Sequence, residues 1–356
     1  MPNISRFNKR LILKPEIMHK VYALITQIDE LKGEWKMGSN LSPQTLGRLK
    51  KSVIITSTGS STRIEGALLN DEQVEKLLGG LEIHKLNTRD EQEVAGYAEL
   101  LTNVFNSYKN IKLTESVIKH FHKELLKYSD KDIAHRGNYK KSPNRVEAKD
   151  NDGNIVGVLF DPTPPHLVAK EMSELISWTN TALSLKEVHP LIIITNFIFE
   201  FLAIHPFQDG NGRLSRILTN VFLLKQGYEF MPYTSHEKFV EDNKKEYYLV
   251  LNKTQKTWKT KKENISLWLL FFLEIFLAQT KMANKLMTEE SMEVLLTEKQ
   301  LLVWNYILKN DMFTPKQIRE NLTMPAPTVQ QVLNKLLRMK KIERLGAGRG
   351  IRYRII

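Results

Sequence analysis

Apolar residues recur at every third or fourth position along most of this 356-residue chain. The first long example runs from Ile17 to Leu31, and this spacing puts its apolar side chains on one face of an α-helix. The same pattern predicts helices that begin at Pro43 and that cover residues 91–108, 113–126, 190–204, 212–225 and 241–252. The sequence therefore predicts an all-α protein in which strands are the exception.

One segment departs from the helical pattern. Two short β-prone runs, 146–149 and 155–160, flank an Asp152-Gly153 pair, and such a pair between strands is typical of a hairpin turn. The acidic string 151–154 also suggests a calcium loop. It lacks the glycine at position six and the glutamate at position twelve of such loops, so a turn is favoured.

Length and composition limit the class of protein. The chain is long enough for two or three domains, and 42% hydrophobic with 26% charged residues is typical of globular proteins. It has no cysteine, which excludes disulfides, thiolate metal sites and a cysteine nucleophile. We see no signal peptide, and the apolar stretch 265–278 is shorter than the roughly 18 residues that span a bilayer. We expect a cytoplasmic protein without membrane contact.

The C-terminal part carries most of the positive charge. Residues 298–356 hold +8 of the net charge of +12, an asymmetry that indicates contact with a polyanion. Three predicted helices are followed by the runs 342–345 and 351–355 around a glycine-rich tip at 346–350, the order of a winged helix-turn-helix. The basic residues of this module that would meet DNA are Lys335, Arg338, Lys340 and Lys341. A solvated face and a protein-docking surface are the alternatives.

The segment His205–Arg216 (HPFQDGNGRLSR) concentrates anion-binding groups at the start of a predicted helix. Its two glycines let the backbone turn tightly and approach a ligand. Free N–H groups at a helix start bind phosphate, and two arginines three residues apart extend that site. The residues that would bind the anion are Gly210, Asn211 through its side chain, Gly212, Arg213 and Arg216.

Two further side chains of the segment bring chemistry to the anion site. Asp209 is an acceptor that can hold Mg²⁺ against phosphates. His205 can accept a proton near neutral pH. Together these groups indicate phosphoryl or nucleotidyl transfer. The alternative is a polar helix cap with incidental charges.

The segment resembles, position for position, the HxFx(D/E)GNGRxxR motif of Fic proteins, and a wider similarity runs from about residue 48 to 278. The resemblance implies a mainly helical Fic fold with a β-hairpin flap at 146–160. It implies that the protein transfers AMP from Mg²⁺-ATP to Ser, Thr or Tyr hydroxyls of target proteins, itself included. His205 would be the base, Phe207 an anchor and Asp209 the metal ligand. The nucleotide-binding residues would be Asp209, Gly210, Asn211, Gly212, Arg213, Arg216, Gly157, Val158, Leu159, Phe160, Tyr247 and Tyr248. Gln255 stands where some relatives have Asn.

A second segment, 61–66, resembles the inhibitory motif (S/T)xxxE(G/N) of Fic proteins through Ser61, Glu65 and Gly66. A glutamate at a helix end can pair with Arg216 and keep that arginine from the γ-phosphate. The resemblance therefore implies inhibition in cis. The alternative is a helix that simply ends at Gly66.

We predict an N-terminal helical region over 1–110, a Fic catalytic domain over 111–290 and a winged helix-turn-helix over 297–356. The leading hypothesis is a protein adenylyltransferase that is inhibited in cis. The alternatives are a DNA-binding regulator whose Fic domain is a sensor, removal of AMP, and transfer of another phosphate-containing group. The sequence does not decide between a monomer and a homodimer.

Overall fold

The structure, a computed structural model, describes residues 6–38, 41, 43–80, 86–144, 146–149, 155–310, 312–339, 341–345 and 351–355. It forms two compact units, Met1–Asn284 and Lys285–Ile356. The predicted turn at 151–154, the glycine-rich tip at 346–350 and Lys340 lie outside the described residues. So do the surroundings of Gly157 and the side chains of Val158 and Leu159.

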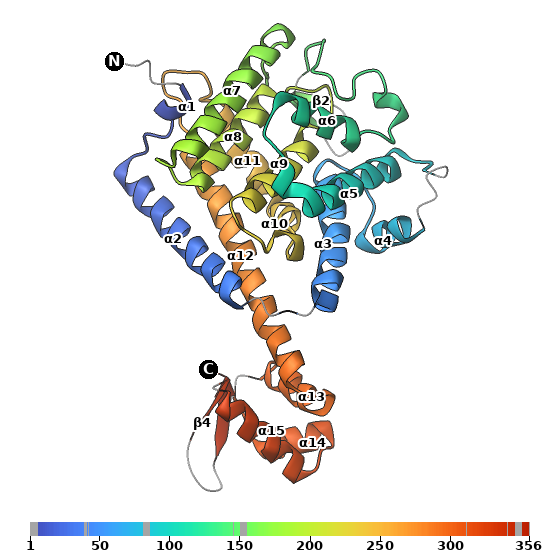
Figure 1. The fold of residues 1–356 in the computed structure, drawn as a ribbon, viewed down its shortest axis with the longest axis vertical. Coiled ribbons are helices and arrows are strands. Elements are labelled where there is room, and N and C mark those ends of the chain that lie inside the picture. The colour runs from blue at the N-terminus through green and yellow to red at the C-terminus, as the bar shows by residue number, and fades with distance from the viewer. Residues whose placement is uncertain are drawn as a thin grey trace. The chain divides into compact units, whose positions relative to one another are not determined.

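The first unit is built almost entirely of helices (Figure 1). Their bounds are α1 Arg6–Lys9, α2 Pro15–Gly38, α3 Pro43–Ile64, α4 Asp71–Gly79, α5 Arg89–Ser107, α6 Glu115–Leu125, α7 Pro165–Leu185, α8 Pro190–Ile204, α9 Asn211–Lys225, α10 His236–Asp242, α11 Lys244–Gln255 and α12 Ser266–Leu295. Short 3₁₀ turns lie at Tyr108–Asn110, Asp130–Asp132 and Met231–Tyr233. The mainly helical class predicted from the sequence is confirmed.

Some details differ from the sequence prediction. Helices α1, α4 and α7 were not predicted, and the helix expected over 241–252 begins only at Lys244 as α11, after the separate short helix α10. The break falls at Asn243, whose side-chain amide donates to the carbonyl oxygen of Phe239 at 2.9 Å. An asparagine that bonds to nearby backbone competes with the helical hydrogen bonds, and this explains the interruption.

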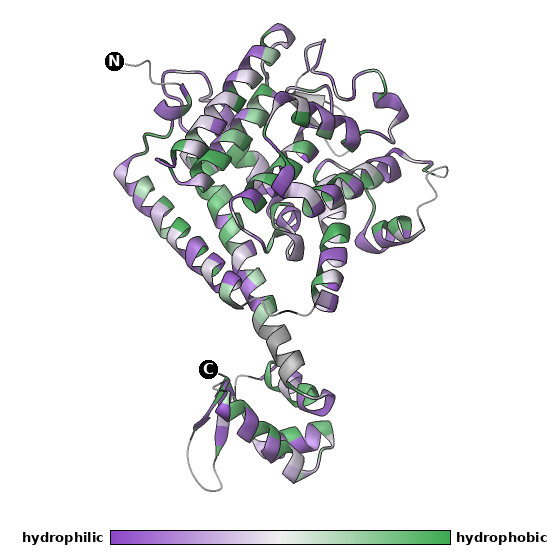
Figure 2. Ribbon diagram, viewed as in Figure 1, coloured by the Kyte–Doolittle hydropathy of each residue, from purple (hydrophilic) through white to green (hydrophobic). Residues whose placement is uncertain are grey.

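Helix α8 forms the centre of the core. All of its residues from Leu191 to Ile204 are buried, and it packs between α7 and α9. A helix that is apolar on every side belongs in the middle of a fold, and Figure 2 shows α8 among the most hydrophobic elements. Glu200 is its one fully buried acid, and it accepts hydrogen bonds from Arg6, Arg10 and Trp258.

Helix α3 is buried through small polar side chains. It contacts α5, α9 and α10, and Ser57, Ser60 and Ser61 of its C-terminal half are fully buried. Ser57 donates to Ser235 at 2.8 Å, and Arg63 forms two hydrogen bonds to Glu241 at 2.6 and 3.1 Å. Helix α3 is thus fixed to α10 by directional polar contacts as well as by packing.

The predicted hairpin is present. Strands β1 (Val146–Lys149) and β2 (Ile155–Phe160) pair antiparallel, with register shifts after residues 146 and 148. Strand β2 contacts α11. At its end Phe160 packs edge-on against Trp258, with ring centroids 5.4 Å apart.

Helix α12 is longer than the apolar stretch that the sequence suggested. Among the described residues, Ser266–Met287 is long and apolar enough, by length and composition, to cross a membrane. The expectation that this stretch is too short to span a bilayer was therefore wrong. Sixty-seven per cent of the apolar window is buried inside the structure, as expected for a core helix.

The second unit has a core of its own. It contains α13 (Glu298–Ile307), β3 (Met312–Phe313), α14 (Pro315–Leu322), α15 (Ala326–Arg338), β4 (Ile342–Leu345) and β5 (Arg352–Ile355). The three strands form an antiparallel sheet in the order β3-β5-β4. Buried residues such as Trp304, Ile318 and Leu333 join the helices to the sheet.

Candidate active site

The candidate base, His205, lies at the junction between the core and the motif loop. It ends α8 in the left-handed conformation, with φ 51°, which costs a non-glycine residue roughly 1–2 kcal/mol. Its Nδ1 lies 3.4 Å from the carbonyl oxygen of Leu202. Because a carbonyl only accepts, Nδ1 carries the proton in this contact and Nε2 is the basic nitrogen.

Burial and a nearby cation keep His205 neutral. Desolvation and the charge of Lys140 lower the pKa of His205 to about 4. Lys140 is itself buried, where its ammonium donates to Asn144 at 2.6 Å, and desolvation lowers its pKa to about 8. At neutral pH the imidazole is therefore unprotonated and free to accept a proton.

The loop after His205 is fixed by side chain-to-backbone bonds. Asn211 accepts from the N–H of Phe207 at 2.9 Å and donates to its carbonyl oxygen at 2.8 Å. Both polar atoms of that amide are thereby used. Asn211 therefore holds the turn closed, and that its side chain also binds the anion stays a prediction.

A second histidine, His122 of α6, holds the same loop. Its ring stacks on Phe207 with centroids 3.8 Å apart, and its Nδ1 accepts from the N–H of Gly137 at 2.8 Å. Its Nε2 must therefore carry the proton, which it donates to the carbonyl oxygen of Asp209 at 2.9 Å. Desolvation lowers the pKa of His122 to about 4, so its neutral form is the one that fits.

Arg213 lies in a cluster of four charges. Its side chain is 2% exposed, and its guanidinium pairs with Glu93 of α5 at 2.8 Å and with Asp209 at 3.2 Å. Arg89 of α5 pairs with the same two acids, at 2.7 Å each. Burial alone would raise the pKa of Asp209, but Arg213, the N–H of Gly210 and Arg89 outweigh it and lower that pKa.

Arg216, one turn further along α9, lies next to the end of α3. It donates to the Ser61 hydroxyl at 2.8 Å, to the Ser61 carbonyl oxygen at 3.0 Å and to Glu65 at 2.7 Å. The carboxylate of Glu65 also lies on the backbone of Gly212. A Cβ at position 212 would be 2.1 Å from Oε1 of Glu65, so only glycine permits this approach. The carboxylate therefore occupies the N-terminus of α9, where an anion would bind.

The two tyrosines of α11 lie near the C-terminal end of α3, beside Glu65 and Arg216. Tyr247 is buried, and desolvation raises its pKa to about 12. Tyr248 donates to the carbonyl oxygen of Ile64 at 3.1 Å, while Lys244 donates to that of Arg63 at 2.9 Å. Helix α11 thus supplies donors to the C-terminal carbonyl groups of α3. Gly66 follows in the left-handed conformation, with φ 105°.

The structure thus brings most of the predicted site residues together. His205 and Asp209 lie in the loop before α9, and the two arginines lie in the first turns of α9 itself. Ser61 and Glu65 contact Arg216 from the end of α3. The backbone of the hairpin contacts α11, but the contacts of Gly157, Val158 and Leu159 lie outside the described side chains. Gln255, which differs from some Fic proteins, is buried at the end of α11.

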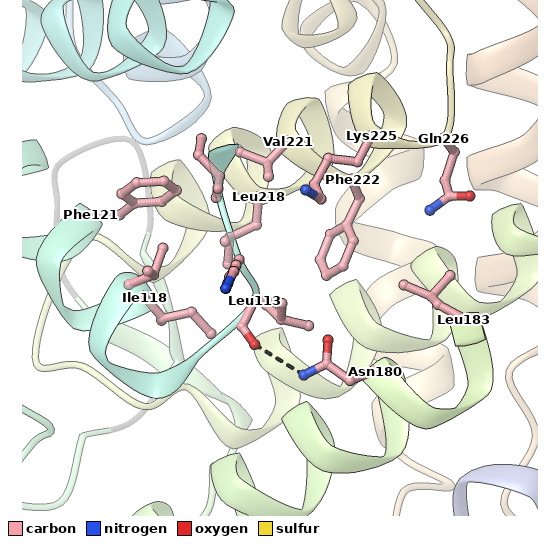
Figure 3. A pocket seen from close by; sticks show the side chains of 13 residues that line it. Leu113, Ile118, Phe121, Asn180, Leu183, Leu218, Val221, Phe222, Lys225 and Gln226 are labelled. Atoms are coloured by element: carbon pink, nitrogen blue, oxygen red, sulfur yellow. Dashed lines mark hydrogen bonds between the residues drawn. The ribbon is translucent and has the colours of Figure 1, made fainter. Parts of the chain in front are cut away.

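A cavity of about 70 Å³ lies elsewhere on α9 (Figure 3). It is lined mostly by apolar side chains, among them Leu218, Val221 and Phe222, and Asn180 donates to the carbonyl oxygen of Leu113 at its edge. None of the residues 205–216 lines it. It is therefore separate from the motif loop.

The described residues contain no group of three or more His, Asp or Glu side chains that could hold a metal ion by themselves. Asp209, whose side chain is 36% exposed beside the start of α9, would supply a single carboxylate ligand. Mg²⁺ is commonly bound by one or two carboxylates together with phosphate oxygens of the substrate. The donor set thus fits a magnesium ion that arrives with a nucleotide.

Residues 112–223 match the model of the Fic/DOC family. The chain contains a Fic/DOC domain. Over 90 residues it is 34% identical to a probable protein adenylyltransferase of Aquifex aeolicus, a match that covers 25% of this chain and 27% of that protein. It is 27% identical over 190 residues to the protein adenylyltransferase Fic of Drosophila pseudoobscura pseudoobscura, covering 52% and 34% of the two chains. The chain thus spans about a third or less of the length of these two curated relatives.

Solved structures share the fold. A Fic family protein from Desulfovibrio desulfuricans G20 has a TM-score of 0.61 at 22% identity, covering 97% of both chains. A variant fragment of Fic-1 from C. elegans also has a TM-score of 0.61, at 19% identity, covering 77% of this chain and 74% of its own. These likenesses show a Fic fold.

Sequence reasoning missed four residues that position the Fic motif, namely Arg89, Glu93, His122 and Lys140. Arg89, Glu93 and His122 lie 87 to 120 residues before their partners in the motif, and the backbone N–H of Lys140 bonds Pro206, 66 residues further along the chain. Nothing in the sequence next to them points to the loop. A buried charged residue on a predicted helix, such as Glu93, would have been the one usable signal.

The buried histidines predict a pH dependence of stability. His122 is fully buried with a pKa near 4, against about 6.5 in an unfolded chain. The unfolded state therefore binds more protons between these values, and the free energy of unfolding falls as the pH is lowered from 6.5 towards 4. His122 contributes at most about 3 kcal/mol to this fall. In urea unfolding, the free energy of unfolding of His122→Gln should depend less steeply on pH than that of the wild type. An unchanged pH dependence would contradict the low pKa assigned to His122.

Proposed function

We propose that this protein is a protein adenylyltransferase that transfers AMP from ATP to hydroxyl groups of target proteins. The observation that carries the proposal is the start of α9. There a neutral histidine, a partly exposed acid and two buried arginines surround the N–H groups of the first turn of the helix. The names of the curated relatives, which are protein adenylyltransferases, point to the same reaction.

We assign a step to each group. Nε2 of His205 takes the proton of the target hydroxyl, whose oxygen attacks the α-phosphorus while the bond to the bridging oxygen breaks and pyrophosphate leaves. The N–H of Gly212 stabilises the charge on the phosphate oxygens, whereas that of Gly210 is donated to Asp209. Arg213 and Arg216 bind the phosphate tail. Asp209 would hold Mg²⁺, which neutralises charge on the phosphates when it is bound.

We also infer that Glu65 inhibits this reaction in cis. Its carboxylate takes one N–H of Arg216 and lies on Gly212. A nucleotide could still enter, but its phosphate tail would lose the Arg216 contact and its α-phosphorus would be turned away from the attacking oxygen. A misplacement of about 1 Å can cost on the order of 100-fold in rate.

The first prediction concerns the base. His205→Ala should lower AMP transfer by about 100- to 10,000-fold while nucleotide binding persists, because only the proton acceptor is removed. Transfer is measured with labelled ATP, and binding of ADP by calorimetry. His166→Ala, at an exposed histidine of α7, is the matched control. Near-normal transfer by folded His205→Ala protein would exclude the assigned role.

The second prediction concerns inhibition. Glu65→Gly should raise self-modification and target modification by roughly 10- to 100-fold, because Arg216 is released to the phosphate tail. Adding Arg216→Ala should reverse the gain. Glu72→Gly, at an exposed acid of α4, should leave the rate unchanged. If Glu65→Gly shows no rise on any target or on itself, the segment 61–66 is only a helix end.

A second candidate function is DNA binding by residues 297–356. This module has the helix and strand order expected of a winged helix-turn-helix, and α15 exposes the amides Gln330, Gln331 and Asn334 together with Arg338. Exposed amides and arginine are the side chains that most often read base edges. Lys335 instead donates to Gln300 of α13 at 3.0 Å, which weakens its predicted DNA role.

The third prediction tests this module. The full chain should bind duplex DNA with an affinity that falls steeply with salt, whereas protein ending before Thr297 should not bind. Arg338→Ala should weaken binding and, if it contacts a phosphate, lower the salt slope by about one. Binding is followed by fluorescence anisotropy. Equal binding by the full and shortened chains would refute a DNA role for the module.

A further inference from the structure

Four charged side chains form a closed ring beside the N-terminus of α9. Arg89 and Arg213 each pair with both Glu93 and Asp209. The members differ in exposure: the side chain of Arg213 is 2% exposed and that of Glu93 9%, against 36% for Asp209 and 51% for Arg89. Arg89 thus covers the solvent side of the candidate metal ligand.

Both carboxylate oxygens of Asp209 are in use. Oδ1 accepts from the N–H of Gly210 at 2.7 Å, and Oδ2 accepts from Arg89 at 2.7 Å and from Arg213 at 3.2 Å. A Mg²⁺ ion needs a carboxylate oxygen at about 2.1 Å. Two arginines and a divalent ion on one carboxylate repel each other, so one arginine has to leave when the ion binds.

Arg89 is the one that can leave. Arg213 is buried, and withdrawing it would leave a charge without a partner. Arg89 is half-exposed and regains water when it moves. Its Nε also donates to Glu93 at 2.7 Å, independently of Asp209. This second contact and the capped start of α5, where Thr88 and Glu91 form a capping box, hold the backbone of Arg89 in place.

We propose that Arg89 is an exchangeable counter-ion of Asp209 that competes with the divalent metal. It pairs with the carboxylate in the nucleotide-free protein, leaves it when the metal–nucleotide complex binds, and returns when that complex dissociates. Arg89 thus sets how much divalent metal the site requires. The inference rests on the proposed function, because the competing metal is the one that arrives with the nucleotide.

Binding of Mn²⁺ in the presence of a non-hydrolysable ATP analogue tests the exchange, with free Mn²⁺ measured by electron paramagnetic resonance. Arg89→Ala should lower the apparent Kd for Mn²⁺ by about two- to fivefold, as expected for the loss of a half-exposed competing ion pair. Arg89→Lys keeps a cation and should lie between Arg89→Ala and the wild type. Arg354→Ala is the matched control, because Arg354 is similarly exposed (56%) and pairs with Glu343 in the other unit. It should match the wild type.

The possible failures are distinguishable. If the wild type binds Mn²⁺ with the analogue but Arg89→Ala binds it equally or more weakly, Arg89 supports the site and the exchange is wrong. If Arg354→Ala tightens binding as much as Arg89→Ala, the effect is one of net charge and the exchange is again wrong. If neither the wild type nor any variant binds Mn²⁺ with the analogue, the proposed nucleotide site is wrong and the exchange falls with it.

Discussion

Two arginine side chains lie almost completely buried at the start of α9, and the rest of the site is arranged around their charge. A buried cation left without a partner costs about 3–5 kcal/mol, so other helices have to supply acceptors. These are Glu93 and Asp209 for Arg213, and Ser61 and Glu65 for Arg216. Because the acceptors come from α5 and α3, both helices must pack on α9 in one register. The pairing of the two buried charges therefore depends on how these helices pack, and a change in the packing would leave an arginine without its partner.

The two arginines are neutralised in different ways. Arg213 is held within a ring of charges. Arg216 instead pairs with Glu65, which lies just after α3 and directly before Gly66, a glycine in the left-handed conformation. Helix α3 is fixed separately, through the Arg63–Glu241 pair and through the donors that α11 offers to its last carbonyl groups. Under the proposed function, a phosphate that displaces the carboxylate need not displace the helix. Inhibition and its relief would then involve a side chain and not a domain movement.

The sequence predicts what is local and misses what is distant. The loop at 205–216 and the helix after it follow from glycines, a helix start and arginines within one turn, and the hairpin follows from one Asp-Gly pair. Arg89, Glu93 and His122 act on that loop from helices far away in the chain, so no spacing rule could find them. The role of Asn211 in closing the turn was not predicted, because the donor and acceptor it meets are backbone atoms of Phe207, which only the folded turn brings to it.

The charges around the candidate anion site also act on the candidate base, His205. Lys140 lowers the pKa of His205, as burial does, whereas the charges of Glu65 and Asp209 raise it. In the proposed reaction the bound phosphates replace Glu65 as the nearest anion. They would offset the field of the cations and make the imidazole a stronger base while the target hydroxyl is present. When pyrophosphate departs, the positive charge of Lys140 would again lower the pKa of His205 and favour release of its proton. Under the proposed function, the anion site and the base would therefore be coupled through charge, although no hydrogen bond joins them among the described residues.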